Sequence, residues 1–188
     1  TLEVLDQHNL LHTGTFRSAE ERDNLLLVEK NEISLAILAY TYGTNGIPIP
    51  SDKPYLVNLL DEERVKHDIA QAKAAGVDLV VAMVHFGNEY QRQPSEEQKR
   101  WVENLKEMGV DLVLGSHPHV VQPYFFGTYT TADGQRRDFA AIYSMGNFIS
   151  NQRGDYKDVG VIFEVEVEKK FPEETIRFKT VSAQPTYV

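Results

Sequence analysis

Two segments of nearly identical sequence constrain the fold of this chain more than any other feature. Residues 73–80 read KAAGVDLV and residues 106–113 read KEMGVDLV. In each, the end of a helix is followed by a glycine suited to a left-handed C-cap and then by an apolar strand. Continuous apolar strands that follow helices indicate a parallel sheet covered on both faces. The near-repeat therefore predicts an α/β fold.

Helices are expected immediately before these two strands. The first is predicted over residues 62–75, and the second begins at Ser95, which forms a capping box with Gln98. The residues expected to face the interior are Val65, Ile69 and Ala72 in the first helix and Trp101, Leu105 and Met108 in the second. An earlier strand is predicted at Ile33 to Thr41, before a Pro-rich loop.

The last third of the chain has the pattern of antiparallel strands. Asp133-Gly134 is a hairpin turn signal between strands predicted at residues 124–131 and 139–145. Apolar and charged residues alternate at 163–168, where the charges are glutamates, and at 176–179, where they are basic. Opposite charges favour pairing of these two segments. The prediction is one domain with a mixed sheet, parallel over about residues 1–122 and antiparallel over about 123–188.

Composition excludes several classes of protein and site. The chain has 188 residues, of which 41% are hydrophobic, and a net charge of −9. The acidic balance argues against nonspecific nucleic-acid binding, and the absence of cysteine excludes disulfides and thiolate zinc sites. No apolar run reaches the roughly 18 residues of a membrane span, and no signal peptide or P-loop pattern occurs. Because the sequence opens at Thr1 on a helix-like segment, we expect a fragment of a longer protein.

Histidines stand where the two apolar strands end. His85 follows residues 77–84, and His117-Pro118-His119 follows residues 110–116. Alternate residues of a strand face the same side, and the ends of parallel strands meet at one edge of a sheet, so we expect the three imidazoles in one pocket. Such a cluster predicts a metal site, with one ion or with two about 3.5–4 Å apart. The alternative is that His117 and His119 are ordinary histidines of a polar loop and that His85 is a satisfied core or loop histidine.

Other polar residues near these strand ends are further candidates. Glu89 is either a metal ligand, an acid or base acting on bound water, or a surface carboxylate. Asn147 orients a substrate, holds a metal ligand in place or occupies a turn, and Gln122 and Gln152 are weaker candidates of the same kind. Three more histidines have no evident partner and are expected at the surface: His8, His12 and His67.

Three motifs together resemble the bacterial CapA family of capsule-synthesis proteins. They are HFGNEY at 85–90, GVDLVLGSHPHVVQ at 109–122 and YSMGNF at 143–148, and the likeness extends from about Leu10 to Phe163. The family is similar to the PgsA component of poly-gamma-glutamate synthesis and to calcineurin-like metallophosphoesterases. The resemblance implies a metallophosphoesterase-like α/β sandwich, of which this chain would be the C-terminal portion, lacking the N-terminal part.

The same resemblance implies roles for individual residues. His85 matches a lone strand-end ligand, whereas His117 and His119 match a late pair of ligands, with Ser116 as an extra residue after the glycine. The early aspartate, Gly-Asp and Asn-His motifs of the superfamily are not found, so about half of the ligands of a divalent metal (Mn, Zn or Fe) are expected outside this chain. Glu89 and His117 are the expected catalytic residues, and Asn147 and Gln122 are expected to contact substrate.

Two functions follow from this resemblance. The first is a metal-dependent hydrolase of phosphoesters or a related bond in the bacterial cell envelope. The second is a non-catalytic assembly or binding component of the machinery that makes a capsule polymer. The expected partners are other capsule-synthesis proteins or an anionic polymer rather than nucleic acid, with either a homo-oligomer or association with a missing N-terminal segment. The intact protein is expected to be membrane-anchored or extracellular.

Overall fold

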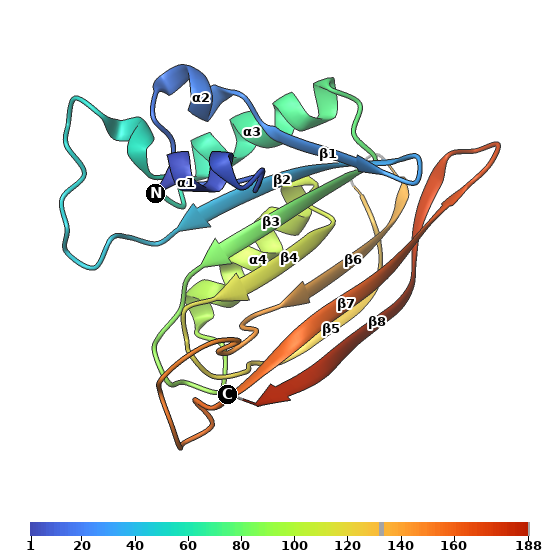
Figure 1. Cartoon of the computed structure of the whole chain (residues 1–188). Coiled ribbons are helices and arrows are strands. Elements are labelled where there is room, and N and C mark those ends of the chain that lie inside the picture. Colours follow the sequence, from blue (N-terminus) through green and yellow to red (C-terminus); the bar gives the residue numbers. More distant parts are fainter. Residues whose placement is uncertain (132–133, 188) are drawn as a thin grey trace. The chain divides into compact units, whose positions relative to one another are not determined.

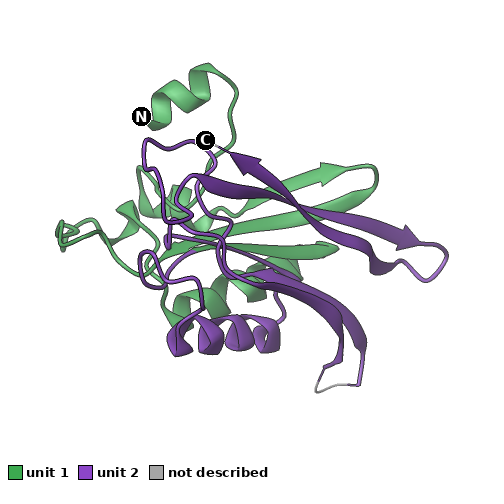
Figure 2. Cartoon of the chain, turned by 90° about the horizontal axis from the view of Figure 1, so that it is seen from below, with its two compact units in different colours: residues 1–84 green, residues 85–188 purple. Residues whose placement is uncertain are grey.

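The computed structural model describes residues 1–131 and 134–187, and the chain divides into two compact units, residues 1–84 and 85–188 (Figure 2). The sequence predicted a single domain in which the strand pairing changes from parallel to antiparallel near residue 122. The boundary between the two compact units lies before the last residue of a strand, and the residues that follow it bond within the second unit. Phe86 N donates to Ser116 O at 3.0 Å, and Tyr90 N donates to Pro118 O at 2.8 Å.

Unit 1 is an α/β unit whose strands lie in the order β1-β2-β3 (Figure 1). Its elements are α1 (Leu2–Gln7), α2 (Ala19–Asp23), β1 (Leu26–Lys30), β2 (Ile33–Thr41), the 3-10 helix η1 (Pro54–Leu56), α3 (Glu62–Ala74) and β3 (Leu79–His85). The arrows of β2 and β3 point the same way in Figure 1, as predicted for the apolar strands. The predicted bounds of β2 are confirmed.

The strand β1 corrects the expectation of a purely parallel first part. It pairs with β2 in an antiparallel hairpin, with Leu26 opposite Ile37 and Lys30 opposite Ile33. The two residues of the turn, Asn31 and Glu32, have φ values of 52° and 62°. Two successive positive φ values are the geometry of a tight hairpin turn whose twist matches that of the strands. Sequence patterning missed this turn because the second position is Glu rather than Gly.

The helix α3 forms where the sequence predicted it. The side chain of Asp61 caps its N-terminus by accepting from Arg64 N at 2.9 Å, and Gly76 follows it with a φ of 71°. Its buried residues include the three predicted ones, Val65, Ile69 and Ala72, and also Asp68. The Tyr40 hydroxyl donates to Asp68 at 2.8 Å, so the buried carboxylate joins α3 to β2.

Unit 2 combines a three-stranded sheet, in the order β4-β6-β5, with a two-stranded sheet, β7-β8. Its elements are α4 (Glu96–Met108), β4 (Leu112–Ser116), β5 (Tyr124–Thr130), β6 (Arg136–Ile142), β7 (Val159–Lys170) and β8 (Thr175–Tyr187). The pair β4-β6 is parallel, whereas β5-β6 and β7-β8 are antiparallel. The predicted hairpin of β5 and β6 is therefore confirmed, although Asp133 of its turn signal lies outside the described residues. This is the expected mixed-sheet α/β architecture.

The helix α4 begins at the predicted capping box, formed reciprocally by Ser95 and Gln98, and ends at Gly109 with a φ of 105°. The buried face of this helix is turned slightly about the helix axis from the predicted one. Gln98, Val102 and Leu105 are buried, whereas Trp101 and Met108 are only partly covered. The reason is that the Gln98 amide is drawn inward by a hydrogen bond to Gln122 Oε1 at 2.8 Å.

The alternating segments of the last third pair as predicted. Val167 lies opposite Phe178 and Glu168 opposite Arg177. Asp138 of β6 fixes this hairpin within unit 2, since its carboxylate accepts from Phe178 N at 2.9 Å. Among the described residues, none of the helices combines the length and apolar character required to cross a bilayer.

Candidate functional site

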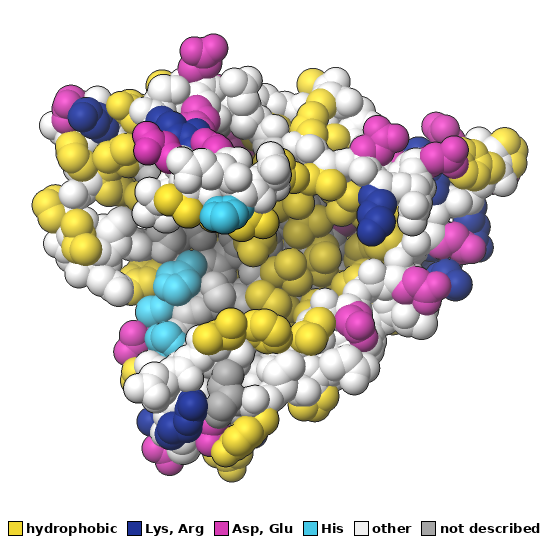
Figure 3. Space-filling view, viewed as in Figure 1, with side chains coloured by type: hydrophobic (Ala, Val, Ile, Leu, Met, Phe, Trp, Pro, Cys, Tyr) yellow, Lys and Arg dark blue, Asp and Glu magenta, His cyan; other side chains and the backbone are white. Residues whose placement is uncertain are grey.

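Three of the histidines lie together in unit 2. His85 is the last residue of β3, and His117 and His119 follow β4. The ring centroids of His85 and His117 are 4.6 Å apart, and those of His117 and His119 are 6.2 Å apart. Figure 3 shows such a group of adjoining histidine side chains at the surface. The structure thus brings the three predicted imidazoles into one place, which we call the histidine cluster, while their role as ligands stays a prediction.

The end of β4 is shaped by the close approach of another strand end. A Cβ on Gly115 would lie 2.0 Å from the carbonyl oxygen of Tyr143, so only glycine fits there. Ser116, the extra residue before the histidine pair, places its Oγ 3.2 Å from Nδ1 of His85. Ser116 therefore joins His85 to the segment that carries the other two histidines.

The backbone of the cluster is strained. His117 has a φ of 104° and His119 a φ of 61°, and nearby Tyr90 has a φ of 65°. Residues other than glycine rarely adopt this left-handed backbone conformation. It costs on the order of 1–3 kcal/mol for each residue and is found most often at functional sites. Tyr90 is held there because its N–H donates to Pro118 O, between the two histidines, at 2.8 Å.

His119 has the most defined surroundings of the three. Its Nδ1 lies 3.0 Å from Oδ1 of Asn147, and its Nε2 lies 3.9 Å from a carboxylate oxygen of Glu89. The ring of Tyr90 stacks on its ring with centroids 5.8 Å apart. Asn147 is held in turn by hydrogen bonds from its amide nitrogen to Lys157 O at 2.8 Å and to Gln152 Oε1 at 3.1 Å. Asn147 therefore orients the His119 ring, and Glu89 faces the other ring nitrogen.

The environment of two of the imidazoles favours their neutral form. Burial lowers the pKa of His85, and repulsion by charged His117 and His119 lowers it further. Burial also lowers the pKa of His117, although the carboxylate of Glu89 acts in the opposite direction. Neutral imidazoles offer a lone pair, so both rings are suited to accept a proton or to bind a cation.

Gln122 is corrected from a substrate contact to a support of the site. Its side chain is 2% exposed, and its amide nitrogen donates to Gln91 O at 2.8 Å and to Gln93 O at 3.3 Å. Its amide oxygen accepts from Gln98, as described above. With both amide atoms engaged in the interior, Gln122 fixes the loop of residues 87–94 that carries Glu89 and Tyr90.

The donors present fit part of a metal site and not a complete one. Over residues 1–131 and 134–187, no group of three or more His, Asp or Glu side chains is arranged to hold a metal ion. The Nδ1 atom of His119 is occupied by Asn147, and that of His85 lies against Ser116. A metal ion would have to use the Nε2 atom of each of these two rings, and the expectation that further ligands lie outside this chain stays a prediction.

The other histidines lie apart from the cluster. His8 and His67 are exposed, as expected. His12 differs from the expectation, because it has a partner and its side chain is only 16% exposed. Its Nε2 lies 3.3 Å from the carboxylate of Asp6.

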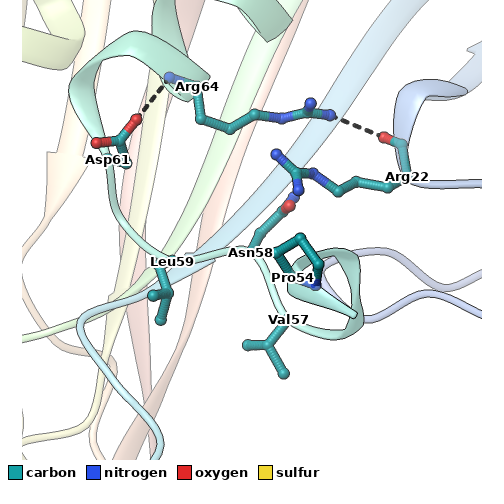
Figure 4. Close-up of a pocket in the computed structure, with 7 residues that line it drawn as sticks. All are labelled: Arg22, Pro54, Val57, Asn58, Leu59, Asp61 and Arg64. Atoms are coloured by element: carbon teal, nitrogen blue, oxygen red, sulfur yellow. Dashed lines mark hydrogen bonds between the residues drawn. The ribbon is translucent and has the colours of Figure 1, made fainter. Parts of the chain in front are cut away.

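Unit 1 contains a cavity of about 200 Å³ with both polar and apolar side chains in its lining (Figure 4). Arg22, Asn58 and Arg64 line it, and Arg64 Nη2 donates to Arg22 O at 3.0 Å. Arg64 is also paired with Asp23 at 2.9 Å and with buried Asp68. We interpret these contacts as holding α2 against α3.

Some residues of the site escaped sequence reasoning. The ring of Tyr90 stacks on His119, the backbone oxygen of Lys157 accepts from Asn147, and the Gln98 amide donates to Gln122, which holds the loop. Tyr90 stood inside a recognised motif, but no spacing connects Lys157 with a strand end. The sequence predicts Gln98 as a capping residue, but its side-chain hydrogen bond to Gln122 is evident only in the structure. Contacts between side chains far apart in sequence leave no periodic signal.

Comparison with known families decides the relationship of the chain. The model of the bacterial capsule synthesis protein family PGA_cap matches residues 1–152. The chain belongs to this family. A capsule biosynthesis protein CapA of Bacillus anthracis is 26% identical over 156 residues, which cover 81% of this chain and 36% of that protein. A PGA biosynthesis protein CapA of Bacillus subtilis (strain 168) is 26% identical over 165 residues, covering 81% of this chain and 38% of that protein.

This member of the PGA_cap family thus spans little more than a third of the length of the CapA relatives it matches. Among solved structures, it is similar to the calcineurin-like phosphoesterase YfkN of Bacillus subtilis, with a TM-score of 0.41 and 15% identity. That similarity covers 87% of this chain and 49% of the other. A likeness at this level is too distant to assign a reaction. The resemblance to the CapA family inferred from the three motifs is confirmed by the family match.

Proposed function

We propose that this chain forms one side of a hydrolytic site in a protein of capsule biosynthesis, acting on a phosphoester or a related bond. The observation that carries the proposal is the histidine cluster, in which His85, His117 and His119 meet on a strained backbone. Membership of the capsule-synthesis family supports the biological process. The reaction is inferred from the chemistry of the cluster.

The chain's own residues support proton transfer at this site. Glu89 lies 3.9 Å from Nε2 of His119, so a water molecule or substrate group between them would meet a carboxylate and an imidazole together. Asn147 holds the His119 ring by its other nitrogen. Neutral His117 offers a further acceptor. These contacts support acid–base roles for Glu89 and His117 and the positioning of His119 by Asn147.

A divalent metal ion (Mn, Zn or Fe) is the second part of the proposal. It would act as a Lewis acid toward the bond to be broken, and His85, His117 and His119 would supply part of its ligands. Because no three donors of the described residues are arranged to hold an ion, we expect this chain alone to bind metal weakly. Metal analysis after dialysis tests this expectation, and a tightly held stoichiometric two-metal centre would contradict it.

The experiment for hydrolysis compares two histidine variants of the intact protein. With added manganese or zinc, it should cleave a generic phosphomonoester or phosphodiester. His119→Ala should reduce the rate about 10- to 100-fold or more, the range seen when a metal site loses a ligand or its support. His67→Ala is the matched control, since His67 is an exposed residue of α3 and should leave the rate unchanged. Equal rates in both variants would reject catalysis at the histidine cluster.

A second candidate function is non-catalytic assembly or binding within the capsule-polymer machinery. The observation that favours it is the incomplete donor set. Under this alternative, the metal-loaded intact protein would hydrolyse neither ester but would co-purify with other capsule-synthesis proteins. We propose for both functions that the intact protein acts at the bacterial cell envelope, which fractionation of cells would test. Sedimentation of the purified protein would show whether it forms a homo-oligomer.

A further inference from the structure

The cavity of unit 1 contains a cation that the fold does not use. Residues of α2, η1, α3 and the loop that joins η1 to α3 line this cavity. Of its two arginines, Arg64 is engaged in the fold by its pairs with Asp23 and Asp68. No carboxylate pairs with Arg22 in the described part of the chain, and its buried Nε has no hydrogen-bond partner there. Solvent hydrates an unpaired arginine at the surface, but a buried N–H without an acceptor is costly.

Asn58 contributes a second unpartnered group to the same cavity. It is 6% exposed, and its Oδ1 is buried without a hydrogen-bond partner among residues 1–131 and 134–187. Its backbone is held on both sides, since Asn58 N donates to Gly14 O at 2.9 Å and Thr41 N donates to Asn58 O at 3.0 Å. Figure 4 shows the Asn58 side chain directed toward that of Arg22. A donor and an acceptor without protein partners therefore lie in one cavity.

The rest of the lining limits what can bind. Pro54, Val57 and Leu59 supply apolar surface, and Asp61 adds a carboxylate. One unpaired guanidinium matches a single negative charge, whereas a dianion such as phosphate would be repelled by the Asp61 carboxylate. The cavity is smaller than the roughly 300–1,000 Å³ of sites for drug-sized ligands, so only a small molecule fits. A small monocarboxylate with an aliphatic chain meets these conditions.

We infer that this cavity is a binding site for a small aliphatic α-amino or α-hydroxy acid. The carboxylate of the ligand pairs with the guanidinium of Arg22 through two parallel N–H bonds. The ammonium or hydroxyl group of the ligand donates to Oδ1 of Asn58, and its aliphatic chain contacts Pro54, Val57 and Leu59. Because the site uses no residue of the histidine cluster, the inference does not rest on the proposed hydrolysis.

The test is a calorimetric titration of the 188-residue chain with four matched ligands. L-leucine and 2-hydroxy-4-methylpentanoate carry both polar groups, 4-methylpentanoate lacks the donor, and 3-methylbutylamine lacks the carboxylate. At least one of the first two should bind with a Kd below about 1 mM. Each of the last two should bind at least about tenfold more weakly. The tighter of the first two identifies the donor group, and inorganic phosphate should not compete with it.

Two variants locate the binding. Arg22→Gln removes the guanidinium and should weaken binding of the tighter acid at least about tenfold. Asn58→Leu keeps the size of the side chain but removes the acceptor, so it should bind that acid no more tightly than 4-methylpentanoate. Arg136→Gln is the control, because Arg136 is an exposed arginine at the first residue of β6. It should leave the affinity unchanged.

Unfolding measurements distinguish a ligand site from a structural role of the same residues. Asn58→Leu replaces a buried oxygen that has no partner, so urea unfolding of this variant without ligand should show no loss of stability. The tighter acid at about 100 times its Kd should raise the unfolding midpoint of the wild-type protein, as mass action requires, but not that of Asn58→Leu.

Three results would overturn the inference. The first is no saturable binding of either acid at about 10 mM, which would mean that only water occupies the cavity. The second is equal binding of the acids and of the ligands that lack a polar group, and the third is equal loss of affinity in Arg22→Gln and Arg136→Gln. Should Arg22→Gln fail to fold, Asn58→Leu decides, and wild-type affinity in that variant would reject the site.

Discussion

Oδ1 of Asn147 lies 3.0 Å from Nδ1 of His119. The other hydrogen bonds of the Asn147 side chain determine which of these two atoms is the donor. The amide nitrogen donates to Lys157 O and to Gln152 Oε1, so the amide cannot be reversed without losing both bonds. The oxygen therefore faces the ring. In neutral His119, Nδ1 must carry the proton and Nε2 must keep the lone pair.

This relationship predicts a tautomer that can be measured. In wild-type protein above pH 8, ¹⁵N NMR should show His119 mainly in the Nδ1–H form. Asn147→Leu removes the acceptor, so the Nε2–H form, which is usually preferred in water, should become the main one. Asn151→Leu is the control, since Asn151 is exposed. An unchanged tautomer in Asn147→Leu would show that the contact does not orient the ring.

Gly115→Ala should destabilise the protein by about 3 kcal/mol or more, because overpacking against backbone cannot be relieved by a rotamer change. The added Cβ would lie 2.0 Å from Tyr143 O. Gly127→Ala provides the comparison, since a Cβ there meets nothing within 4 Å. Urea unfolding should show a change of less than about 1 kcal/mol for it. Similar stability of the two variants would mean that β4 and the Tyr143 segment are less closely packed than described.

Gln122→Leu should loosen the loop that carries Glu89 and Tyr90. The substitution removes the hydrogen bonds of Gln122 with Gln91 O, Gln93 O and the Gln98 amide, each of which contributes about 0.5–1.5 kcal/mol. Hydrogen exchange in residues 87–94 should become faster, together with a loss of unfolding free energy. Gln135→Leu, at an exposed glutamine, should change neither quantity. Unaltered exchange in Gln122→Leu would contradict the supporting role.

Asp138 should make the stability of unit 2 depend on pH. Burial alone would raise the pKa of its carboxyl, but hydrogen bonds from Phe178 N and Thr128 and the charge of Arg177 outweigh burial and lower it. Between the folded and unfolded pKa values the unfolded state binds more protons, so the contribution is present above about pH 4 and is lost as pH falls through the folded value.

Asp138→Asn should therefore cost about 1.5–3 kcal/mol at pH 7, the range for hydrogen bonds to a charged group. The difference from wild type should shrink below about pH 4. Urea unfolding of both proteins at pH 7 and near pH 3 measures it. Asp155→Asn, at a carboxylate that is 91% exposed, is the control and should have little effect at either pH. A difference that stays constant with pH would show that the charge of Asp138 is not what stabilises the hairpin.

Local patterns in the sequence were sufficient for most elements and for the membership of the cluster. The capping box of Ser95 and Gln98, the glycines 76 and 109 and the alternation in β7 and β8 each depend on neighbours within a few residues. The three histidines could be found because each stands at the end of an apolar strand. The hairpin β1-β2 was missed, since Asn31 and Glu32 adopt positive φ without a glycine to signal it.

Only the tertiary structure decided what each polar side chain near the cluster does. Gln122 and Asn147 carry the same amide group and were given the same role from sequence. One is buried under the loop of residues 87–94, and the other faces His119. Lys157 belongs to the site because it contacts Asn147 and Tyr90, which lie 10 and 67 positions away in the sequence. Periodicity records which face of an element a residue occupies, but the partner of a hydrogen bond is set by the packing of distant segments, and that packing has no local pattern.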